Sequence, residues 1–198
     1  MIMLKIENLI KIFFNFFYKK YLFFSSEIIL GQKVFFCSKP VIIAVKKTRL
    51  EIGDNVLINS CKKRYHLNMH SRCKILLDRT GATIKIGANT RIHGSCIHAY
   101  KKIVIGKSCL IAANTQIVDG NGHDLSFDFP EKRIDTTGDA KDIMIGDNVW
   151  IGSNCFILPG TTIGSGSVIS ANSVVRGNIP EMCLAGGNPI QILKSYQD

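Results

Sequence analysis

Aliphatic residues recur at every sixth position in the C-terminal part of the chain. From Ile145 the sequence reads IGDNVW, IGSNCF, ILPGTT, IGSGSV, ISANSV and VRGNIP, and every hexad begins with Ile or Val. Glycine takes the second position three times. The fifth position holds Val149, Cys155, Thr161, Ser167, Ser173 and Ile179. The same pattern appears upstream in hexads that begin at Ile52, Ile86, Ile92, Ile105 and Ile111.

A period of six is too short for a helical repeat, and it suits a short strand followed by a tight turn. Three such sides close a triangular coil of about 18 residues, and coils stack at the ~4.8 Å strand spacing. We expect the first position to point inward, the glycine to serve a corner with an unusual φ angle, and the fifth residue to fill the corner. Cys96, Cys109 and Cys155 take that fifth position. The pattern therefore predicts an all-β parallel helix with structural thiols.

The repeat breaks once. The phase that runs through Ile105, Ile111 and Ile117 does not reach Ile145, because the 28 residues between Ile117 and Ile145 are not a multiple of six. Residues 118–142 must leave the coil as an extended polar loop. A flat solenoid side offers no cleft, whereas an outward loop can wrap a neighbouring subunit and close a pocket.

His123 is the residue of that loop best suited to move a proton near neutral pH. A side chain that accepts a proton can serve as the general base for a reacting hydroxyl group. His123 is therefore the candidate general base, and the nearby Asp119 and Asp124 are candidates to orient its imidazole. A solvent-exposed loop histidine is the structural alternative.

The amino-acid composition limits the classes of partner that this protein is expected to bind. The 198 residues carry a formal net charge of +10, which favours anionic partners. No helix-turn-helix, zinc-finger or RNA-binding aromatic motif is present, so we expect no nucleic acid. The seven cysteines form no C-x-x-C motif, which indicates reduced thiols in the cytoplasm.

The N-terminal segment is apolar, but lysines and a glutamate interrupt it, so neither a membrane span nor a secretory signal is expected. Asn8, Lys11, Asn15 and Lys19 form a polar stripe at helical spacing. This predicts an amphipathic helix that either lies on the inner face of the membrane through residues 1–30 or packs on protein. The chain then divides into the helical segment 1–33, the β-helix 34–183 with its loop 118–142, and a tail 184–198.

Over residues 84–194 the chain resembles the hexapeptide-repeat, left-handed β-helix acyltransferases. The likeness is strongest where DNVWIGSNCFILPGTTIGSGSVISANSVV leads into IP and AGGNP. It is similar to the maltose and galactoside type of sugar O-acetyltransferase. The resemblance implies a left-handed coil, a homotrimer, acetyl-CoA bound between subunits, and a histidine base at the position of His123.

Cofactor positions follow from the resemblance. Trp150 and Ser153 match residues that line the pantetheine channel, and Ala171 matches one whose backbone binds the pantetheine amides. Lys194 falls at a basic position near the adenosine 3′-phosphate. The chain has Arg176 followed by glycine where relatives often carry Thr-Lys, so Arg176 is the candidate replacement for that lysine. As alternatives, Trp150 is outer packing, Ser153 a turn residue and Lys194 a surface charge.

Acceptor positions are less defined. His93 and Ser95 lie where the sugar enzymes place an acceptor-binding asparagine, which is absent here, and Asn121 in the long loop is a further candidate. His66 and His70 belong to the basic stretch KKRYHLNMHSR. This stretch is either part of an acceptor or diphosphate site or a solvated edge.

The leading interpretation is an acetyl-CoA-dependent O-acetyltransferase that acts on a sugar hydroxyl by direct transfer, without a metal, in surface polysaccharide such as capsule or O-antigen. An N-acetyltransferase acting on an amino sugar or serine-type acceptor and a non-catalytic trimeric scaffold are the alternatives. A zinc carbonic anhydrase with His93 and His98 as ligands shares the coil, but it does not account for the long loop or the AGGNP tail.

Overall fold

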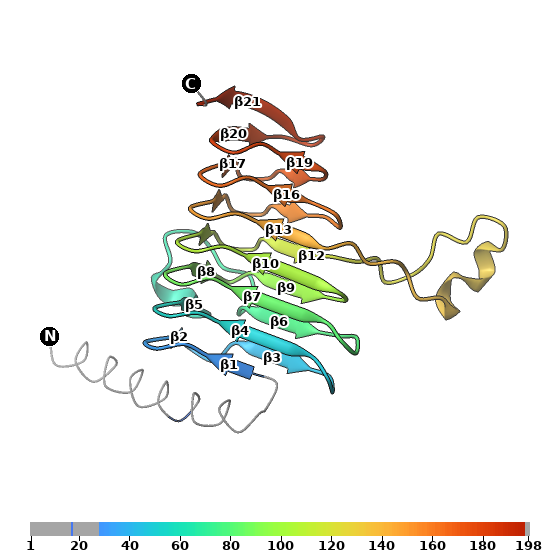
Figure 1. The fold of residues 1–198 in the computed structure, drawn as a ribbon, viewed down its shortest axis with the longest axis horizontal. Coiled ribbons are helices and arrows are strands. Elements are labelled where there is room, and N and C mark those ends of the chain that lie inside the picture. The colour runs from blue at the N-terminus through green and yellow to red at the C-terminus, as the bar shows by residue number, and fades with distance from the viewer. Residues whose placement is uncertain (1–16, 18–27, 197–198) are drawn as a thin grey trace, which may run out of the picture.

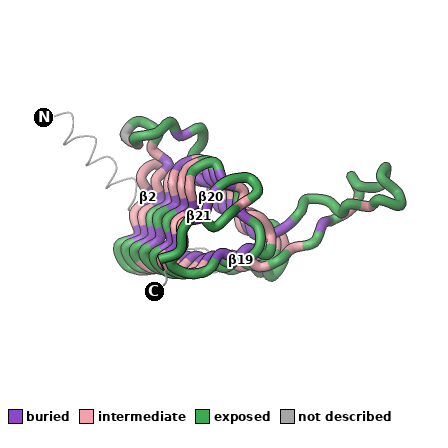
Figure 2. The backbone as a smooth tube through the Cα atoms, turned by 90° about the horizontal axis from the view of Figure 1, so that it is seen from above, coloured by how far each residue is buried: buried purple, intermediate pink, exposed green. Residues whose placement is uncertain are grey.

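Successive strands fall in turn on three sheets, A, B and C, which form the sides of a triangular prism (Figures 1 and 2). The computed structural model describes residues 17 and 28–196. Up to β20, each strand pairs in parallel with the strand three places further along the chain. This pairing is the signature of a coil that returns to the same side after every three strands, as the hexads predict.

Sheet A contains seven strands: β1 (Ile28–Leu30), β4 (Arg49–Ile52), β7 (Thr83–Ile86), β10 (Lys102–Ile105), β13 (Ile143–Ile145), β16 (Thr162–Ile163) and β19 (Asn178–Ile179). Sheet B contains eight: β2 (Phe35–Cys37), β5 (Leu57–Asn59), β8 (Arg91–His93), β11 (Leu110–Ile111), β14 (Trp150–Ile151), β17 (Val168–Ile169), β20 (Cys183–Gly186) and β21 (Gln191–Ser195). Sheet C contains six: β3 (Val41–Ala44), β6 (Lys74–Leu77), β9 (Cys96–Ala99), β12 (Gln116–Val118), β15 (Phe156–Ile157) and β18 (Val174–Val175).

The first position of each hexad forms the core. In sheet B, Ile111 stacks between Ile92 and Ile151, and Ile169 follows on the next coil. All four side chains are at most 1% exposed. Each buried aliphatic side chain of this size stabilises the fold by about 1.5–3 kcal/mol. The predicted aliphatic column is confirmed.

Glycine at the second hexad position has a different role from the predicted one. The positive φ angles fall two residues later, as at Asn148 (φ 58°) and Asn154 (φ 56°). The glycines are instead required by close approach between coils. A Cβ added to Gly152 would lie 2.5 Å from the backbone nitrogen of Ala171. The expectation of an unusual φ angle was therefore wrong for these glycines, because the stacking of coils sets the constraint.

Two fifth-position assignments were also wrong. Ile179 pairs with Ile163 and points inward, because the side that begins at Val175 is shortened and turns at Gly177. Cys96 opens strand β9, and its neighbour Ser95 fills the corner at 0% exposure. The remaining corner residues are buried as predicted.

Three edges join the sheets. We name them edge A–B, edge B–C and edge C–A after the sheets they connect. The chain leaves edge C–A between β12 and β13, where residues 119–142, the flap, project far from the prism (Figures 1 and 2). A shorter excursion, residues 60–72 with the 3₁₀ turn η1 (Lys62–Arg64), leaves edge B–C between β5 and β6. The flap contains a second 3₁₀ segment, η2 (Pro130–Asp135).

The ends of the coil differ from the predicted boundaries. β1 pairs with β4 from Ile28 onward, so the coil begins inside the segment 1–33 that was predicted to be helical. The amphipathic helix and the membrane contact predicted for residues 1–30 otherwise fall outside the described residues. In the tail, β21 folds back antiparallel onto β20 and covers the last coil.

Candidate functional site

The neck of the flap is fixed by Asp119. Its side chain is fully buried, and its carboxylate accepts hydrogen bonds from the backbone N–H groups of Tyr100, Lys101 and Lys102 at 2.6–2.9 Å. These bonds leave the carboxylate facing the turn of the neighbouring coil. The prediction that Asp119 orients the imidazole of His123 is therefore wrong, because backbone amides already use its oxygens.

A second set of contacts clamps the two strands of the neck together. Gly120 forms an antiparallel bridge with Ala140. A Cβ at Gly120 would meet the ring of Tyr100 at 2.7 Å, so only glycine fits there. The guanidinium of Arg79 stacks 4.3 Å from the centre of the Tyr100 ring and donates to the Gly138 carbonyl at 2.8 Å. The flap therefore leaves the prism on a defined path.

His123 lies beyond this neck and is exposed. Its Nδ1 lies 2.8 Å from the backbone carbonyl of Arg133. Because a carbonyl only accepts, Nδ1 must carry the hydrogen, and the lone pair of the neutral ring stays on Nε2. Asp124 does not touch the ring: its N–H donates to the Thr136 hydroxyl at 2.8 Å, and its carboxylate accepts from the N–H of Ser126 at 2.9 Å. The Arg133 carbonyl is thus the partner that orients His123.

The tip of the flap is apolar and acidic. Leu125, Phe127, Phe129 and Ile134 are between 55% and 78% exposed. Asp124, Asp128, Glu131 and Asp135 lie among them. Four large exposed apolar side chains on one projection indicate a surface that meets other protein.

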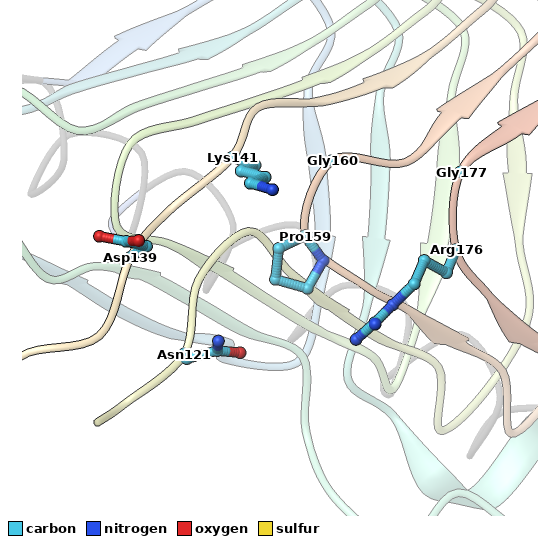
Figure 3. Close-up of a pocket in the computed structure, with 7 residues that line it drawn as sticks. All are labelled: Asn121, Asp139, Lys141, Pro159, Gly160, Arg176 and Gly177. Atoms are coloured by element: carbon cyan, nitrogen blue, oxygen red, sulfur yellow. The ribbon is translucent and has the colours of Figure 1, made fainter. Parts of the chain in front are cut away.

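A cavity of about 350 Å³ opens at edge C–A beside the neck (Figure 3). Its lining comes from the flap and from two turns of the coils above: Asn121, Asp139, Lys141, Pro159, Gly160, Arg176 and Gly177. Lys141 and Arg176 bring two cations to this cavity against the one carboxylate of Asp139, and the excess positive charge suits a phosphate or carboxylate group. Of the predicted residues, Asn121 and Arg176 share this site, and both lie on the edge from which His123 projects.

Ser153 and Ala171 lie on edge B–C instead, in successive coils. The N–H of Asn172 donates to the Ser153 carbonyl at 2.9 Å, and that of Asn154 to the Ala113 carbonyl at 3.0 Å. Small residues at this edge leave the backbone accessible.

Trp150 and Lys194 both point outward from sheet B, in one column through Val168 and Leu184. Trp150 is half-exposed rather than packed. The single chain therefore divides the predicted cofactor residues between two edges and one face.

The two acceptor candidates, His93 at the end of β8 and Ser95 in the turn that follows, have different environments. Ser95 is buried, and its single hydroxyl hydrogen is shared between the carbonyls of Ala112 and His93, which lie 2.8 and 2.9 Å from Oγ, so it cannot contact a sugar. His93 is half-buried and stacks on Tyr65 of the 60–72 excursion, with ring centres 4.6 Å apart. Burial, and then the charges of Arg91 and His66, lower the pKa of His93 to about 4.

The thiols of the corners carry no sign of nucleophilic activation. Cys109 and Cys155 donate to the carbonyls of Gly146 and Ser170 at 3.1 Å, and burial raises both pKa values. Burial also raises the pKa of Cys96, although this thiol lies on a strand rather than in a corner. Raised thiol pKa values suit structural cysteines.

His93 and His98, the candidate zinc ligands, lie on different sheets. His93 pairs with Asn59, whereas His98 lies 3.2 Å from the Asp78 carboxylate. Within residues 17 and 28–196, no group of three or more His, Cys, Asp or Glu side chains could hold a metal ion.

Arg79, Tyr100 and Lys141 were missed by the sequence analysis. The partners of Arg79 and Tyr100 are backbone groups and ring faces brought together by stacked coils, so hexad spacing contains no signal for them. Lys141 lies just before strand β13 begins at Ile143, and its closeness to Arg176 depends on the turn at Gly177.

The fold and the hexapeptide repeat together indicate the class of protein that this chain resembles. The sheets of this chain form a left-handed parallel β-helix, and residues 142–177, a short part of the chain, match the family described as bacterial transferase hexapeptide (six repeats). No helix in the part of the chain that the structure describes combines the length and hydropathy needed to span a membrane.

The relatives of this chain are acetyltransferases. A polysialic acid O-acetyltransferase of Escherichia coli O1:K1 / APEC is 36% identical over 134 residues, which are 65% of this chain and 43% of that protein. This chain therefore spans less than half the length of that curated relative. A hexapeptide-repeat-containing acetyltransferase of Vibrio cholerae O1 biovar eltor, solved with acetyl coenzyme A, is 29% identical, with a TM-score of 0.56 over 87% of this chain and 72% of that one. Galactoside acetyltransferase in complex with coenzyme A, at 23% identity and a TM-score of 0.54 over 86% of this chain and 66% of that one, shares the fold.

Proposed function

We propose that this protein is an acetyl-CoA-dependent O-acetyltransferase that modifies a sugar hydroxyl. The observation that carries the proposal is the hydrogen bond from His123 to the Arg133 carbonyl, which leaves Nε2 as a base on the one long excursion of the coil. The acetyltransferase relatives supply the reaction class.

The proposed transfer is direct. The acceptor hydroxyl gives its proton to Nε2 of His123 while its oxygen attacks the thioester carbonyl carbon. The tetrahedral oxyanion then collapses, the C–S bond breaks, and the departing thiolate of CoA takes the proton from the imidazolium. The products are an O-acetyl sugar and free CoA, so no protein nucleophile is required.

Acetyl-CoA fits the residues found on two edges. Lys141 and Arg176 line a cavity with the charge to take a phosphate group. Ser153 and Ala171 offer a narrow strip of exposed backbone for the amides of the pantetheine arm, with Trp150 and Lys194 on the adjoining face. We assign the cofactor to these residues, and we assign no metal.

The division of these residues between edges supports a homotrimer. The flap starts at edge C–A, whereas Ser153 and Ala171 lie on edge B–C, so one chain alone does not assemble them. If three prisms pack side by side, the flap of one subunit can reach edge B–C of the next. The exposed apolar side chains of the flap, and its carboxylates opposite a basic edge, favour that contact.

The acceptor that the comparisons favour is a glycan, because the E. coli relative is named for polysialic acid. We extend this acceptor class to surface polysaccharide that is made in the cytoplasm. The N-terminal segment is then the candidate for contact with the membrane. An N-acetyltransferase on an amino sugar or serine-type acceptor and a trimeric scaffold without activity remain the competing hypotheses.

An acceptor screen that follows release of the CoA thiol tests the proposal. The wild-type protein should release CoA with at least one sugar acceptor, and His123→Ala should reduce turnover by roughly 10²–10⁴ while acetyl-CoA binding persists. A free amine as the preferred acceptor would replace O-transfer by N-transfer. Unchanged turnover in His123→Ala would remove this residue from the mechanism.

A further inference from the structure

The excursion of residues 60–72, which we call the basic loop, is anchored along edge B–C. The side chain of Met69 is buried against Gly94, and a Cβ at Gly94 would lie 2.9 Å from Met69 Cε. Asn114 fastens the far end: its Oδ1 accepts from the N–H of His70 and its Nδ2 donates to the Asn68 carbonyl, both at 2.9 Å. The basic loop is therefore a built part of this edge rather than a loose turn.

The loop covers a small aromatic cluster. Tyr65 lies between His93, whose ring centre is 4.6 Å away, and His66, at 4.4 Å. The Oδ1 of Asn59 accepts from the N–H of Cys61, so its Nδ2 is the atom that faces Nδ1 of His93 at 3.1 Å. Since Nδ1 accepts that bond, the neutral ring of His93 carries its hydrogen on Nε2 and presents a donor.

This cluster lies on the same edge as the proposed cofactor strip. The Ala113 carbonyl accepts from the N–H of Asn154, in the coil that carries Ser153, and the next residue, Asn114, is the one that holds the basic loop. Ala171 follows on the next coil. With about 4.8 Å between coils, the basic loop lies roughly one to two coils from the proposed path of the pantetheine arm.

Charge distinguishes this edge from the other two. The loop contains Lys62, Lys63, Arg64 and Arg72 with two histidines, and no acidic residue. Asp54, Asp147 and Glu181 lie on edge A–B, and the carboxylates of edge C–A include Asp78, Asp119 and Asp142. Among residues 28–196, no acidic residue occupies the turns of edge B–C. Lys63 and Arg72 are exposed there.

We propose that the basic loop and the Tyr65–His93 pair form the acceptor subsite, and that this subsite selects sugars bearing an anionic group, carboxylate or phosphate, over neutral sugars. The inference rests on the proposed O-acetyltransferase function and names its class of acceptor. The exposed ring of His66, which lies beside Tyr65, offers a flat surface for a sugar ring, and Nε2–H of His93 can donate to a sugar hydroxyl. Lys63 and Arg72 attract the anionic substituent, and no carboxylate from the turns of this edge in the same chain competes with it.

Kinetics with four acceptors test the selection: oligosialic acid and oligogalacturonic acid carry carboxylates, glucose 6-phosphate carries a phosphate, and maltotetraose is neutral. At low ionic strength at least one anionic acceptor should exceed maltotetraose in kcat/KM by tenfold or more, and 0.5 M NaCl should reduce that advantage. The double variant Lys63→Gln/Arg72→Gln should raise KM for the anionic acceptor roughly 3- to 30-fold and leave KM for acetyl-CoA unchanged. Lys107→Gln on edge A–B is the matched control and should change neither constant.

Two other results would overturn the inference. If maltotetraose were the preferred acceptor at low salt, the positive charge of the basic loop would not select anionic acceptors. Loss of the oligomer in Lys63→Gln/Arg72→Gln, measured by sedimentation, with an unchanged KM for the anionic acceptor, would show that the cations hold a neighbouring flap instead.

Binding without turnover separates this inference from the proposed function. Saturation-transfer NMR with His123→Ala should show contact to the anionic oligosaccharides and weak or no contact to maltotetraose. If no acceptor releases CoA but this binding persists, the proposed reaction fails and the subsite stands. If turnover occurs but none of the three anionic probes binds, the subsite fails and the reaction stands.

Discussion

The imidazole of His123 donates its Nδ1–H to the backbone carbonyl of Arg133, 2.8 Å away, within a flap that otherwise projects from a rigid prism. The same carbonyl accepts from the hydroxyl of Thr136 at 2.8 Å, and that hydroxyl accepts from the N–H of Asp124 at 2.8 Å. The orientation of the ring is thus set by the backbone of the flap itself. Two predictions about the flap follow from this arrangement and from its neck.

Replacing Thr136 with Val should loosen the ring without removing it. The lost hydrogen bonds are worth about 0.5–1.5 kcal/mol each, so kcat should fall roughly 2- to 10-fold while KM for acetyl-CoA stays constant. Steady-state kinetics measure both constants, with Thr162→Val on the outer face of sheet A as control. An effect confined to KM would argue that Thr136 contacts a substrate instead of positioning His123.

Replacing Asp119 with Asn should release the neck of the flap. One amide oxygen cannot accept all three backbone N–H groups that the carboxylate accepts, and the amide NH₂ then faces backbone donors. We expect kcat to fall at least 10-fold and hydrogen exchange to increase at residues 100–102 and in the neck. Exchange in sheet B should not change, because the coil remains closed there. Unaltered exchange in the neck would show that the clamp of Arg79 and Tyr100 holds the flap without Asp119.

Arg176 and Lys141 should act on the cofactor rather than on the chemical step. Because both line one cavity, Arg176→Gln and Lys141→Gln should each raise KM for acetyl-CoA several-fold, and more at low than at high ionic strength. The kcat at saturating acetyl-CoA should stay near the wild-type value. Isothermal titration with CoA measures the effect directly, and an identical affinity for 3′-dephospho-CoA in the wild type and Arg176→Gln would support contact with the 3′-phosphate. A change in acceptor KM alone would place this cavity in the acceptor site.

Stability should depend on pH through His93. Its pKa in the folded protein is about 4, below the ordinary 6.5, so between these values the unfolded chain binds a proton that the folded chain excludes. Stability should therefore fall as pH drops from 6.5 toward 4 and be insensitive to this residue above 7. Denaturant titrations should show a smaller loss over that window for His93→Gln than for the wild type or for His70→Gln, the control on the same loop. Equal losses in all three proteins would mean that carboxylates alone control acid unfolding.

The close approach of coils should make Gly152 irreplaceable. An added Cβ would lie 2.5 Å from the nitrogen and 2.8 Å from the Cα of Ala171, and backbone atoms cannot move aside as a flexible side chain can. Gly152→Ala should destabilise the protein by about 1–3 kcal/mol and weaken acetyl-CoA binding at the same edge. Gly122→Ala, where no atom lies within 4 Å of the added Cβ, is the stability control. Thermal unfolding of both variants tests the comparison.

The hexads determined most of the fold, because each coil contacts only its neighbours and one short rule repeats. The positions of Ile111 and Ile151 in the core, and the departure of the flap after Val118, follow from that rule alone. The rule failed where a side has fewer than six residues, as at Cys96 and Ile179. One shortened side shifts a residue from a corner onto a strand, and composition gives no warning of it.

The sequence by itself determined the coil, its aliphatic core, the single long break and the identity of the histidine in that break, since all four depend on local spacing. Only the tertiary structure decided what the polar residues touch: Asp119 holds backbone amides, Ser95 is sealed in a corner, and Lys141 joins Arg176 beside the flap. Those contacts between coils join residues that are 17 or more positions apart, so they arise from stacking and from the length of each side. Spacing along one coil cannot specify them, because the partner of a side chain lies on the next coil rather than further along its own strand.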